Sequence, residues 1–311
     1  VVLLLQVPRT NDKKELAAEQ MFASLHGLLT LPSSKMLQPT MRERISCEIA
    51  VVAKRIGFYV WVPNYLKNFV EEQIYAQYPN VQISEVPDYT MTPDGGFSTR
   101  LVTELKLTAA DPLPVKTFQS FEVDPLAAIT ATLAKFSDDE EAWIQMVVKP
   151  AAGNWHKKSE KYIAGLRNGK TSNMSGVLSA LWAPPEYKTE ASKLTDYEQT
   201  RAAGAETKSQ KLAFETAIRI VYRGNIPIQQ AKLHMQSIVA SYKQFNTTYL
   251  NGFEAKRIAD DPYQLAMYRD RGFHKAGAIL NIEEIATLYH MPHTNVETPY
   301  ILWAASQTAE P

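Results

Sequence analysis

The sequence predicts an α+β fold of two tandem ferredoxin-like units with antiparallel sheets, followed by a helical connector. Apolar residues recur at every second position across residues 44–62, a pattern typical of a β-hairpin. Strand and helix patterns around it complete the order β-α-β-β-α-β, which is the split βαβ arrangement of that fold. The same order returns in the second half. We expect units at residues 1–90 and 97–256 and a connector at 257–311.

The first unit opens with a strand and an amphipathic helix. Residues 1–7 are an apolar run of the length of a buried strand. A helical stripe follows, formed by Ala18, Phe22, Leu25 and Leu29. The hairpin comes next, reversing at Lys54-Arg55. We expect one face of the hairpin to be buried and the other to carry Ser46, Glu48, Tyr59 and Trp61.

A second helix and a last strand close the first unit. Leu66, Val70 and Ile74 have helical spacing, and Asn64 is placed to cap that helix. Residues 81–86 alternate as a short strand. Turn residues dominate 87–96, so we place the domain boundary there.

The second unit contains an insertion. Residues 99–107 alternate as a strand, Asp124-Pro125 is typical of a helix start, and 142–148 predict another strand. We expect the acidic run 138–141 to be a solvated reversal. Residues from about 150 to 211 are rich in small and polar residues, which indicates a partly helical insertion.

The unit then resumes and leads into the connector. Residues 213–222 predict a strand, a long helix follows Pro227, and 247–253 can return as a last strand. In the connector, Asp261-Pro262 predicts a helix start, and Asn281 with Glu284 has the form of a capping box. From Met291 onward, we expect an extended linker.

Composition bounds the possible partners. The 311 residues are 45% hydrophobic and 21% charged, as in ordinary globular proteins. Basic and acidic residues balance at 33 each, so nucleic acid or anionic membrane could bind only through a local patch. The single cysteine, Cys47, occupies an inward strand position, which indicates a core residue and not a nucleophile.

Two aromatic residues are candidates for nucleic-acid binding. Tyr59 and Trp61 lie on the third strand of a β-α-β-β-α-β unit, where RNA-recognition modules carry their stacking aromatics. Aromatic side chains on a strand also serve ordinary packing, and residues 1–7 offer no matching aromatic. Base stacking and packing therefore both stay open for this face.

A basic patch in the insertion is the second candidate. It consists of Lys157, Lys158, Lys161, Arg167 and Lys170. Such a patch could contact phosphates, in which case affinity for DNA would fall steeply with salt. The alternative is a solvated helix face.

Two further motifs fail on their spacing. In 165–171, GLRNGKT, only three residues separate the glycines where a phosphate loop needs four. His290 and His293 are separated by a proline and lack the glutamate that a zinc-protease helix carries between its histidines. No Ser/His/Asp or Cys/His set can be assigned. We therefore predict no catalytic, cofactor-binding or metal-binding residue in this chain.

The two ends of the chain resemble a known family. Residues 279–292, ILNIEEIATLYHMP, with 298–303, TPYILW, and 309–311, AEP, resemble the passage before the motor domain of conjugative type IV secretion coupling ATPases. These are HerA/FtsK-like, TraD-like proteins of candidate-phylum, Saccharibacteria-like bacteria. Residues 5–12, LQVPRTND, and 18–22, AEQMF, resemble the opening of their soluble region.

The resemblance implies a non-catalytic amino-terminal region of a DNA-translocating machine. In such proteins, membrane helices would precede Val1 and a motor that binds ATP and Mg²⁺ would follow Pro311. The chain would then be a cytoplasmic fragment, associated with the inner membrane through segments outside it. Its expected partners are its own motor domain, secretion-system subunits and further copies of itself. The alternative is a nucleic-acid-binding module that uses the aromatic sheet face and the basic insertion.

Overall fold

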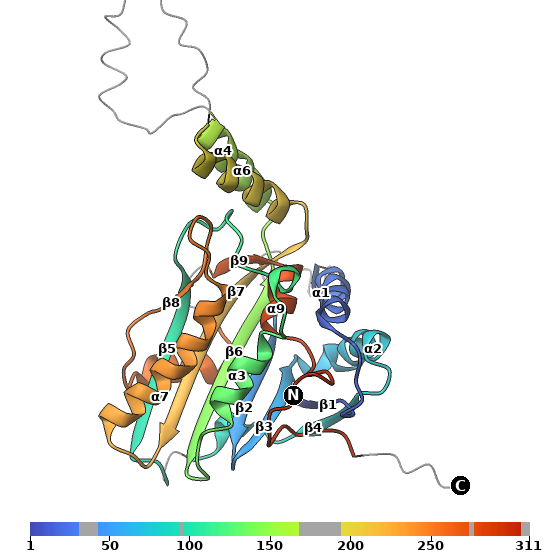
Figure 1. The fold of residues 1–311 in the computed structure, drawn as a ribbon. Coiled ribbons are helices and arrows are strands. Elements are labelled where there is room, and N and C mark those ends of the chain that lie inside the picture. Colours follow the sequence, from blue (N-terminus) through green and yellow to red (C-terminus); the bar gives the residue numbers. More distant parts are fainter. Residues whose placement is uncertain (31–42, 94–95, 168–193, 274–276, 306–311) are drawn as a thin grey trace, which may run out of the picture.

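The chain forms a mixed α+β fold around one antiparallel sheet of nine strands (Figure 1). The structure is a computed structural model that describes residues 1–30, 43–93, 96–167, 194–273 and 277–305. The strands lie in the order β4-β1-β3-β2-β6-β7-β5-β8, and β9 pairs with β7. Within the described residues, no helix combines the length and hydropathy that crossing a bilayer requires.

The first half contains the elements that its patterns predict. They are β1 (Val2–Gln6), α1 (Glu15–Thr30), β2 (Ile45–Val52), β3 (Arg55–Trp61), α2 (Lys67–Gln77) and β4 (Gln82–Val86). The prediction that Asn64 caps the second helix is wrong. A 3-10 turn over Asn64–Leu66 comes first, and α2 begins only at Lys67. All four residues of the predicted stripe on α1 are buried.

The hairpin reverses one residue earlier than expected. Val52 pairs with Arg55, so Ala53 and Lys54 form the turn, with φ angles of 46° and 60°. A two-residue turn with positive φ at both positions matches the right-handed twist of the flanking strands. The twist of the hairpin therefore imposes a left-handed backbone on an alanine and a lysine.

The described residues of the second half form four strands and four helices. They are β5 (Thr99–Leu107), α3 (Leu126–Leu133), β6 (Glu140–Pro150), α4 (Trp155–Arg167), α6 (Asp196–Ser209), β7 (Ala213–Gly224), α7 (Ile228–Ser241) and β8 (Phe253–Ala255). Without α4 and α6, the element order is that of the first half. The strand order β6-β7-β5-β8 also mirrors β4-β1-β3-β2 about the β2–β6 pair.

Two expectations for this half need correction. The acidic run 138–141 is a solvated reversal only in its first half: Asp138 and Asp139 form an exposed turn, but Glu140 and Glu141 open β6 and are only 4% and 8% exposed. They are buried because His234 and Arg223 meet their carboxylates. The last strand begins at Phe253 instead of spanning 247–253, since residues 247–252 fold back and Asn251 bonds the loop around Leu113.

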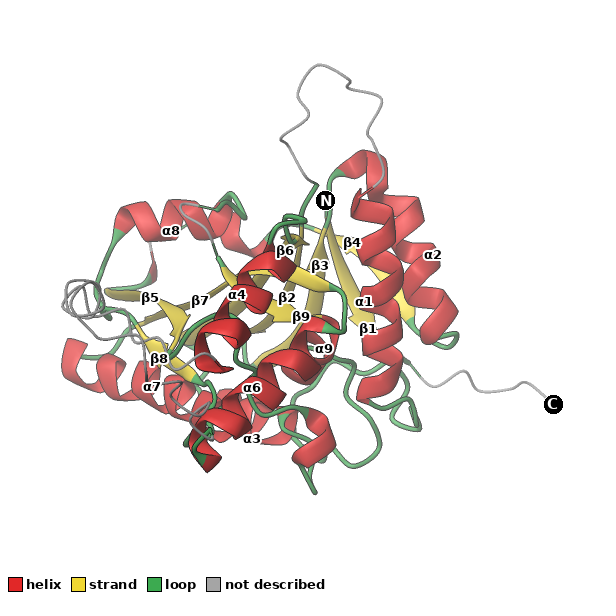
Figure 2. Ribbon diagram, turned by 90° about the horizontal axis from the view of Figure 1, so that it is seen from above, coloured by secondary structure: helices red, strands yellow, loops and turns green. Residues whose placement is uncertain are grey.

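Helices cover the two faces of the sheet unequally. Figure 2 shows α8 (Pro262–Arg269) across the sheet from α3, α7 and α9 (Ile282–Leu288). The main core lies under α1, α2, α3, α7 and α9. A smaller core lies on the opposite face, where Tyr89 and Tyr268 pack against Trp143. Both faces of the central strands are therefore buried.

The connector begins as predicted but does not end as a linker. Asp261 accepts a hydrogen bond from the Gln264 amide, and Asn281 and Glu284 form the predicted capping box. Beyond α9, however, Met291, Val296 and Ile301 are buried. The tail packs on the body because these apolar side chains reach the core.

The tail also closes against β3 by backbone hydrogen bonds. The Ile56 amide donates to the Tyr300 carbonyl at 2.9 Å, and the Leu302 amide donates to the Ile56 carbonyl at 2.9 Å. These bonds form an isolated parallel bridge between Ile56 and Ile301. The end of the described chain is thus part of the folded body.

The insertion forms a helical projection, here called the arm and defined as α4 with α6. Figure 1 shows the arm standing above one end of the sheet. Its two helices share a small core of Ile163, Ala202 and Ala205. At its base, the Ala151 amide donates to the Ala213 carbonyl at 2.9 Å, so the chain leaves β6 and enters β7 at neighbouring points.

We expect Ala53→Asn to stabilise the protein. Asparagine tolerates a left-handed backbone better than alanine, so the free energy of unfolding should rise by about 0.5–1 kcal/mol. Urea unfolding followed by circular dichroism measures this change. The control Ala305→Asn, at an exposed position with ordinary backbone, should leave the midpoint unchanged. A midpoint that falls for Ala53→Asn would contradict the strained-turn explanation.

Candidate functional site

The sheet face that we considered for base stacking is largely covered. Tyr59 is 8% exposed, and its ring lies 5.0 Å from that of Tyr89. Burial, with the nearby charge of Glu48, raises the pKa of Tyr59 to about 12. Trp61 is half-buried, with the Arg44 guanidinium 5.7 Å from its ring. Tyr59 therefore offers no open ring face to a base, and only Trp61 stays partly exposed.

A buried ion network occupies the centre of this face. Glu48 on β2 is fully buried, and Arg271, just after α8, is 1% exposed. Arg271 Nε lies 3.0 Å from Glu48 Oε1, and Nη2 lies 3.3 Å from Oε2. The same guanidinium donates to Asp88, which precedes the 3-10 turn Tyr89–Met91. One arginine thus ties the segment before β5 and the segment after α8 to the middle of the sheet.

Neutral groups complete the shell around the Glu48 carboxylate. Tyr89 donates from its hydroxyl at 2.6 Å, Ser46 from its hydroxyl at 2.7 Å and Gln145 from its amide at 3.1 Å. A buried carboxylate is tolerated when its charge is paired and its oxygens accept hydrogen bonds. Because these oxygens already have several donors each, the network is suited to holding the covering segments in place.

A second ion pair lies on the same face, toward the start of β6. Arg223 Nε is 2.8 Å from Glu141 Oε2, and Trp143 donates to the same oxygen at 3.1 Å. The Arg223 guanidinium also stacks 4.5 Å from the Trp143 ring. Burial of charged strand residues is therefore a repeated feature of this face.

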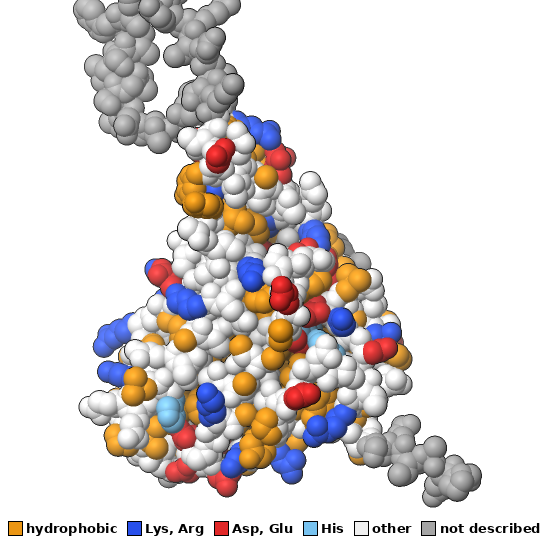
Figure 3. Space-filling model, in the orientation of Figure 1, with side chains coloured by type: hydrophobic (Ala, Val, Ile, Leu, Met, Phe, Trp, Pro, Cys, Tyr) orange, Lys and Arg blue, Asp and Glu red, His pale blue; other side chains and the backbone are white. Residues whose placement is uncertain are grey.

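The basic candidates in the insertion lie on the arm. Lys157, Lys158 and Lys161 are exposed on α4. Arg167 is also exposed and forms an ion pair with Glu206 of α6. In Figure 3, basic, acidic and apolar side chains lie side by side on the visible face of the arm. Lys170 falls outside the described residues, as does most of the glycine motif at 165–171.

Four ionisable side chains from three regions meet beside α1. Glu15 opens α1, Asp124 precedes α3, and His290 and His293 follow α9. His290 Nε2 lies 3.0 Å from Asp124 Oδ1 and 3.9 Å from Glu15 Oε1, and His293 Nε2 lies 3.0 Å from Asp124 Oδ2. We call this group the His–Asp cluster. It is almost completely enclosed, because only Glu15 keeps more than a tenth of its side chain exposed.

Charge and hydrogen bonding set the protonation of the His–Asp cluster. The His290 Nδ1 atom lies 2.8 Å from the Ala286 carbonyl oxygen, which only a protonated nitrogen satisfies. Its Nε2 atom faces Asp124. Burial opposes this ionised pair, but Asp124 outweighs burial and raises the pKa of His290, while the two histidines hold the pKa of Asp124 below its usual value. His290 is therefore an imidazolium that pairs with Asp124.

Three donors of the His–Asp cluster could share a metal ion. One ligand atom each from Glu15, Asp124 and His293 lies within 4.8 Å of the others. From their spacing in the sequence, the two histidines are not expected to be metal ligands. The carboxylates of Glu283 and Glu284, just upstream, pair with Lys211 and Lys208. The sequence indicated Asp124 only as a helix cap. Its place beside the histidines could not be predicted, because it is far from them along the chain.

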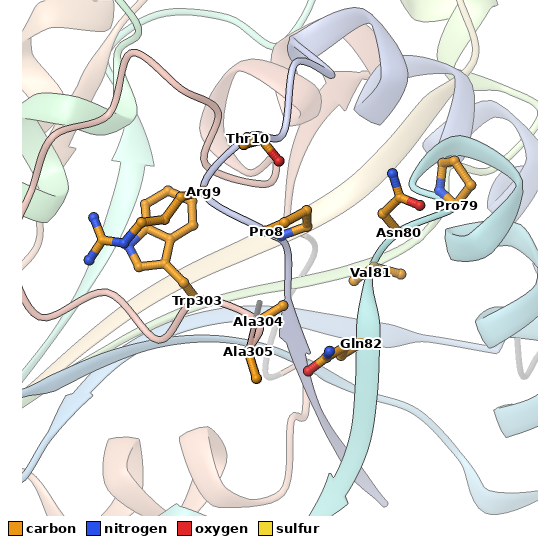
Figure 4. A pocket seen from close by; sticks show the side chains of 10 residues that line it. All are labelled: Pro8, Arg9, Thr10, Pro79, Asn80, Val81, Gln82, Trp303, Ala304 and Ala305. Carbon is orange, nitrogen blue, oxygen red and sulfur yellow. The ribbon is translucent and has the colours of Figure 1, made fainter. Parts of the chain in front are cut away.

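A surface hollow of about 540 Å³ lies between the two chain ends (Figure 4). Arg9 and Trp303 form one wall, with the guanidinium 5.3 Å from the indole ring. Asn80 and Gln82, before and within β4, face them from the other side. No sequence pattern indicated this hollow, because its walls come from three separate segments.

The lone cysteine is a core residue, as predicted. Cys47 is buried on β2, and burial together with Glu48 raises the pKa of its thiol well above the usual range. A thiol with a raised pKa is a poor nucleophile because the reactive species is the thiolate.

Comparison with known proteins identifies the family. A family model described as "Domain of unknown function (DUF8128)" matches residues 4–304. The chain belongs to the DUF8128 family. No curated protein matches it.

One solved structure shows a weak likeness to the DUF8128 chain. It is a xylooligosaccharide oxidase from Myceliophthora thermophila C1 in complex with xylobiose, with 9% identity and a TM-score of 0.31. The match covers 98% of this chain and 55% of that chain, so this chain spans about half the length of the oxidase. At that TM-score, the likeness supports no conclusion about fold or chemistry.

We expect Glu48→Ala to destabilise the DUF8128 chain strongly. Removing one partner of a buried pair leaves Arg271 with an uncompensated charge, which costs about 3–5 kcal/mol of unfolding free energy. Urea unfolding measures the loss. The control Glu85→Ala removes the exposed ion pair with Lys67 and should leave the midpoint unchanged. A loss no larger than that of the control would show that the network is dispensable.

We also expect a pH-dependent effect of Asp88→Asn. Burial raises the pKa of Asp88, but hydrogen bonds and charge from Arg271, with bonds from Thr90, outweigh burial and lower it. Asp88 then contributes stability that is full above its unfolded pKa of about 3.9 and is lost as the pH falls through its lowered folded pKa. The stability gap between wild type and variant should therefore shrink below about pH 4. Urea unfolding midpoints measured from neutral to acidic pH test this prediction, with Asp12→Asn at an exposed position as the control. A stability difference between wild type and Asp88→Asn that does not change with pH would contradict it.

Proposed function

We propose that this DUF8128 chain is the non-catalytic amino-terminal region of a type IV secretion or conjugation translocase ATPase. In this proposal, it docks and assembles the machine at the cytoplasmic face of the inner membrane, while ATP and Mg²⁺ are used by a separate motor domain. Its partners are that motor domain, secretion-system subunits and further copies of itself. Attachment to the membrane is through segments outside this chain.

The resemblance at the two chain ends supports the proposal, and these ends pack together. The Thr294 amide donates to the Asn11 carbonyl at 2.9 Å, and the Ala304 amide donates to the Val7 carbonyl at 2.9 Å. The Gln6 side chain donates to the Trp303 carbonyl at 3.0 Å. The two segments that resemble the coupling ATPases are therefore neighbours in one structural unit, as a shared role requires.

The arm is the observation that carries a docking role. It stands off one end of the sheet and holds a small core of its own. The body remains continuous beneath it, because β6 and β7 stay paired to Pro150 and Phe214 at its base. The strands of the body pair without the arm, so the arm is free to serve as a surface that contacts a partner protein.

We further propose that the body consists of two ferredoxin-like units joined edge to edge. Each half has the order β-α-β-β-α-β, and the strand orders mirror each other across the β2–β6 pair. Such a pseudo-symmetric body exposes β4 and β8 as its outer edges, which are the natural places for pairing with another chain.

We expect removal of the arm to abolish assembly and to preserve the body. The variant replaces residues 155–206 by six Gly/Ser residues, which can span up to about 20 Å and keep Lys208 in its buried contact with Glu284. Size-exclusion chromatography with light scattering should show an oligomer for the wild type and a monomer for the variant. Ala53→Asn serves as the folded control.

Circular dichroism of the arm variant confirms that its body is folded. An arm variant that assembles like the wild type, or a wild type that stays monomeric at every concentration, would overturn the proposed docking role. The proposed identity of the full-length protein can be checked independently. The DNA downstream of the codons for this chain should encode a phosphate loop within about a hundred codons.

A second candidate function is nucleic-acid binding through the arm. The observation that favours it is the group of three exposed lysines on α4, Lys157, Lys158 and Lys161. Since positive and negative charges balance over the whole chain, such binding would be local to the arm.

We expect the triple variant K157A/K158A/K161A to reveal any such role. If the lysines contact phosphates, gel shifts with DNA should weaken and the salt slope of log K should fall by about three. Lys13→Ala with Lys14→Ala, at exposed sites before α1, is the matched control. If the wild-type chain does not bind DNA, or if its affinity for DNA does not depend on salt concentration, this candidate function is ruled out.

A further inference from the structure

We propose that Glu15, Asp124 and His293 form a binding site for one divalent transition-metal cation, with His290 as a positioning residue. The cation would be of the Zn²⁺ or Mn²⁺ class, which combines carboxylate and imidazole ligands. This inference goes beyond the proposed docking function and does not rest on it.

The free ligand atom is one oxygen of Asp124. The Oδ1 atom accepts from the Leu126 amide at 2.7 Å and from His290 at 3.0 Å. The Oδ2 atom is fully buried, and its one near contact is His293 Nε2 at 3.0 Å, which does not make a well-formed hydrogen bond with it. A buried carboxylate oxygen without a hydrogen bond is costly, and a metal ion would satisfy it.

The spacing of the donors fits a metal ion after a small closure. Ligands at about 2.0–2.2 Å from a cation lie roughly 2.8–3.1 Å from one another in octahedral geometry and roughly 3.3–3.6 Å in tetrahedral geometry. The 3.0 Å between Asp124 Oδ2 and His293 Nε2 fits the octahedral spacing and is a few tenths of an ångström short of the tetrahedral one. Glu15 lies within 4.8 Å of both and is the most exposed of the three, so a change of its side-chain rotamer can bring it in.

The charges of the cluster favour a cation. Two carboxylates, Glu15 and Asp124, lie together in a largely enclosed space, and buried carboxylates are tolerated when they are paired or bind a metal ion. His290 is held through its Nδ1 atom by the Ala286 carbonyl, so it orients Asp124 as outer-shell partners of metal ligands do. A divalent cation between the two carboxylates would pair with both.

Metal binding requires one change in His293, a shift of its ring proton. Its Nδ1 atom lies 3.4 Å from the Asn295 amide, so in this arrangement its proton sits on Nε2. Ligation through Nε2 moves that proton to Nδ1 and gives up this long contact. The cation would then tie α1, the start of α3 and the segment after α9 together, and three protein ligands would leave positions open to water or a ligand group.

The test is titration of metal-free chain 1–311 with Zn²⁺ and, separately, with Mn²⁺. After treatment with a chelator and its removal, calorimetry and elemental analysis should show one equivalent bound. Glu15→Gln and His293→Gln should each weaken binding at least about tenfold. The control is His234→Gln. It removes a histidine of α7 that pairs with Glu140 of β6, away from the cluster, and this variant should bind the metal like the wild type.

A second readout keeps the test independent of any folding defect. The melting temperature of the wild type and of His234→Gln should rise with the metal, and that of Glu15→Gln should not. Absence of binding by either metal, or binding that Glu15→Gln and His293→Gln leave unchanged, would show that the cluster is an ion pair only.

Discussion

The antiparallel pairing of β2 with β6 is the constraint on which the rest of the structure depends. It joins residues 45–51 to 142–148 and thereby makes one sheet from two halves of the chain. An antiparallel sheet can leave one face in water, but here the central strands are covered on both faces, so every side chain on them must find a buried place. The main core fills the face under α1, α3 and α7, and the opposite face has to bury what remains.

Besides its smaller hydrophobic core, that opposite face buries charged side chains. Glu48, Arg223 and Glu141 would be solvated on an open sheet, but here they are enclosed by α8 and the turn after Asp88. Buried ion pairs contribute little net stability compared with apolar residues of the same shape, but they penalise wrong arrangements heavily. The Glu48–Arg271 pair is therefore best understood as the feature that selects one position for the covering segments.

Closure of the chain ends creates the second unusual environment. The first helix packs against α9, and the His–Asp cluster lies where Glu15 of α1 meets Asp124, just before α3, and the histidines that follow α9. The body is thus closed around its own termini, and the arm projects from one end of the sheet in Figure 1, joined to the body through α6 by contacts such as the Lys208–Glu284 ion pair. This division between a closed body and a projecting arm is the physical basis for our proposal that the arm serves docking.

The sequence by itself determined the local elements. Period-two alternation located β5 at residues 99–107 to the residue, and the capping signals of Asp261 and of Asn281 with Glu284 placed α8 and α9. These signals are short-range, because a strand pattern or a cap involves neighbours within a few positions. The buried position of Cys47 followed from the same alternation.

Only the tertiary structure decided which faces are open and which charges meet. Glu48 and Arg271 are 223 residues apart, and Asp124 lies 166 residues before His290. A buried charge is matched by whichever segment the packing brings against it, and no local pattern encodes that segment. The same reason explains why an aromatic strand face looked available for bases and is in fact largely covered.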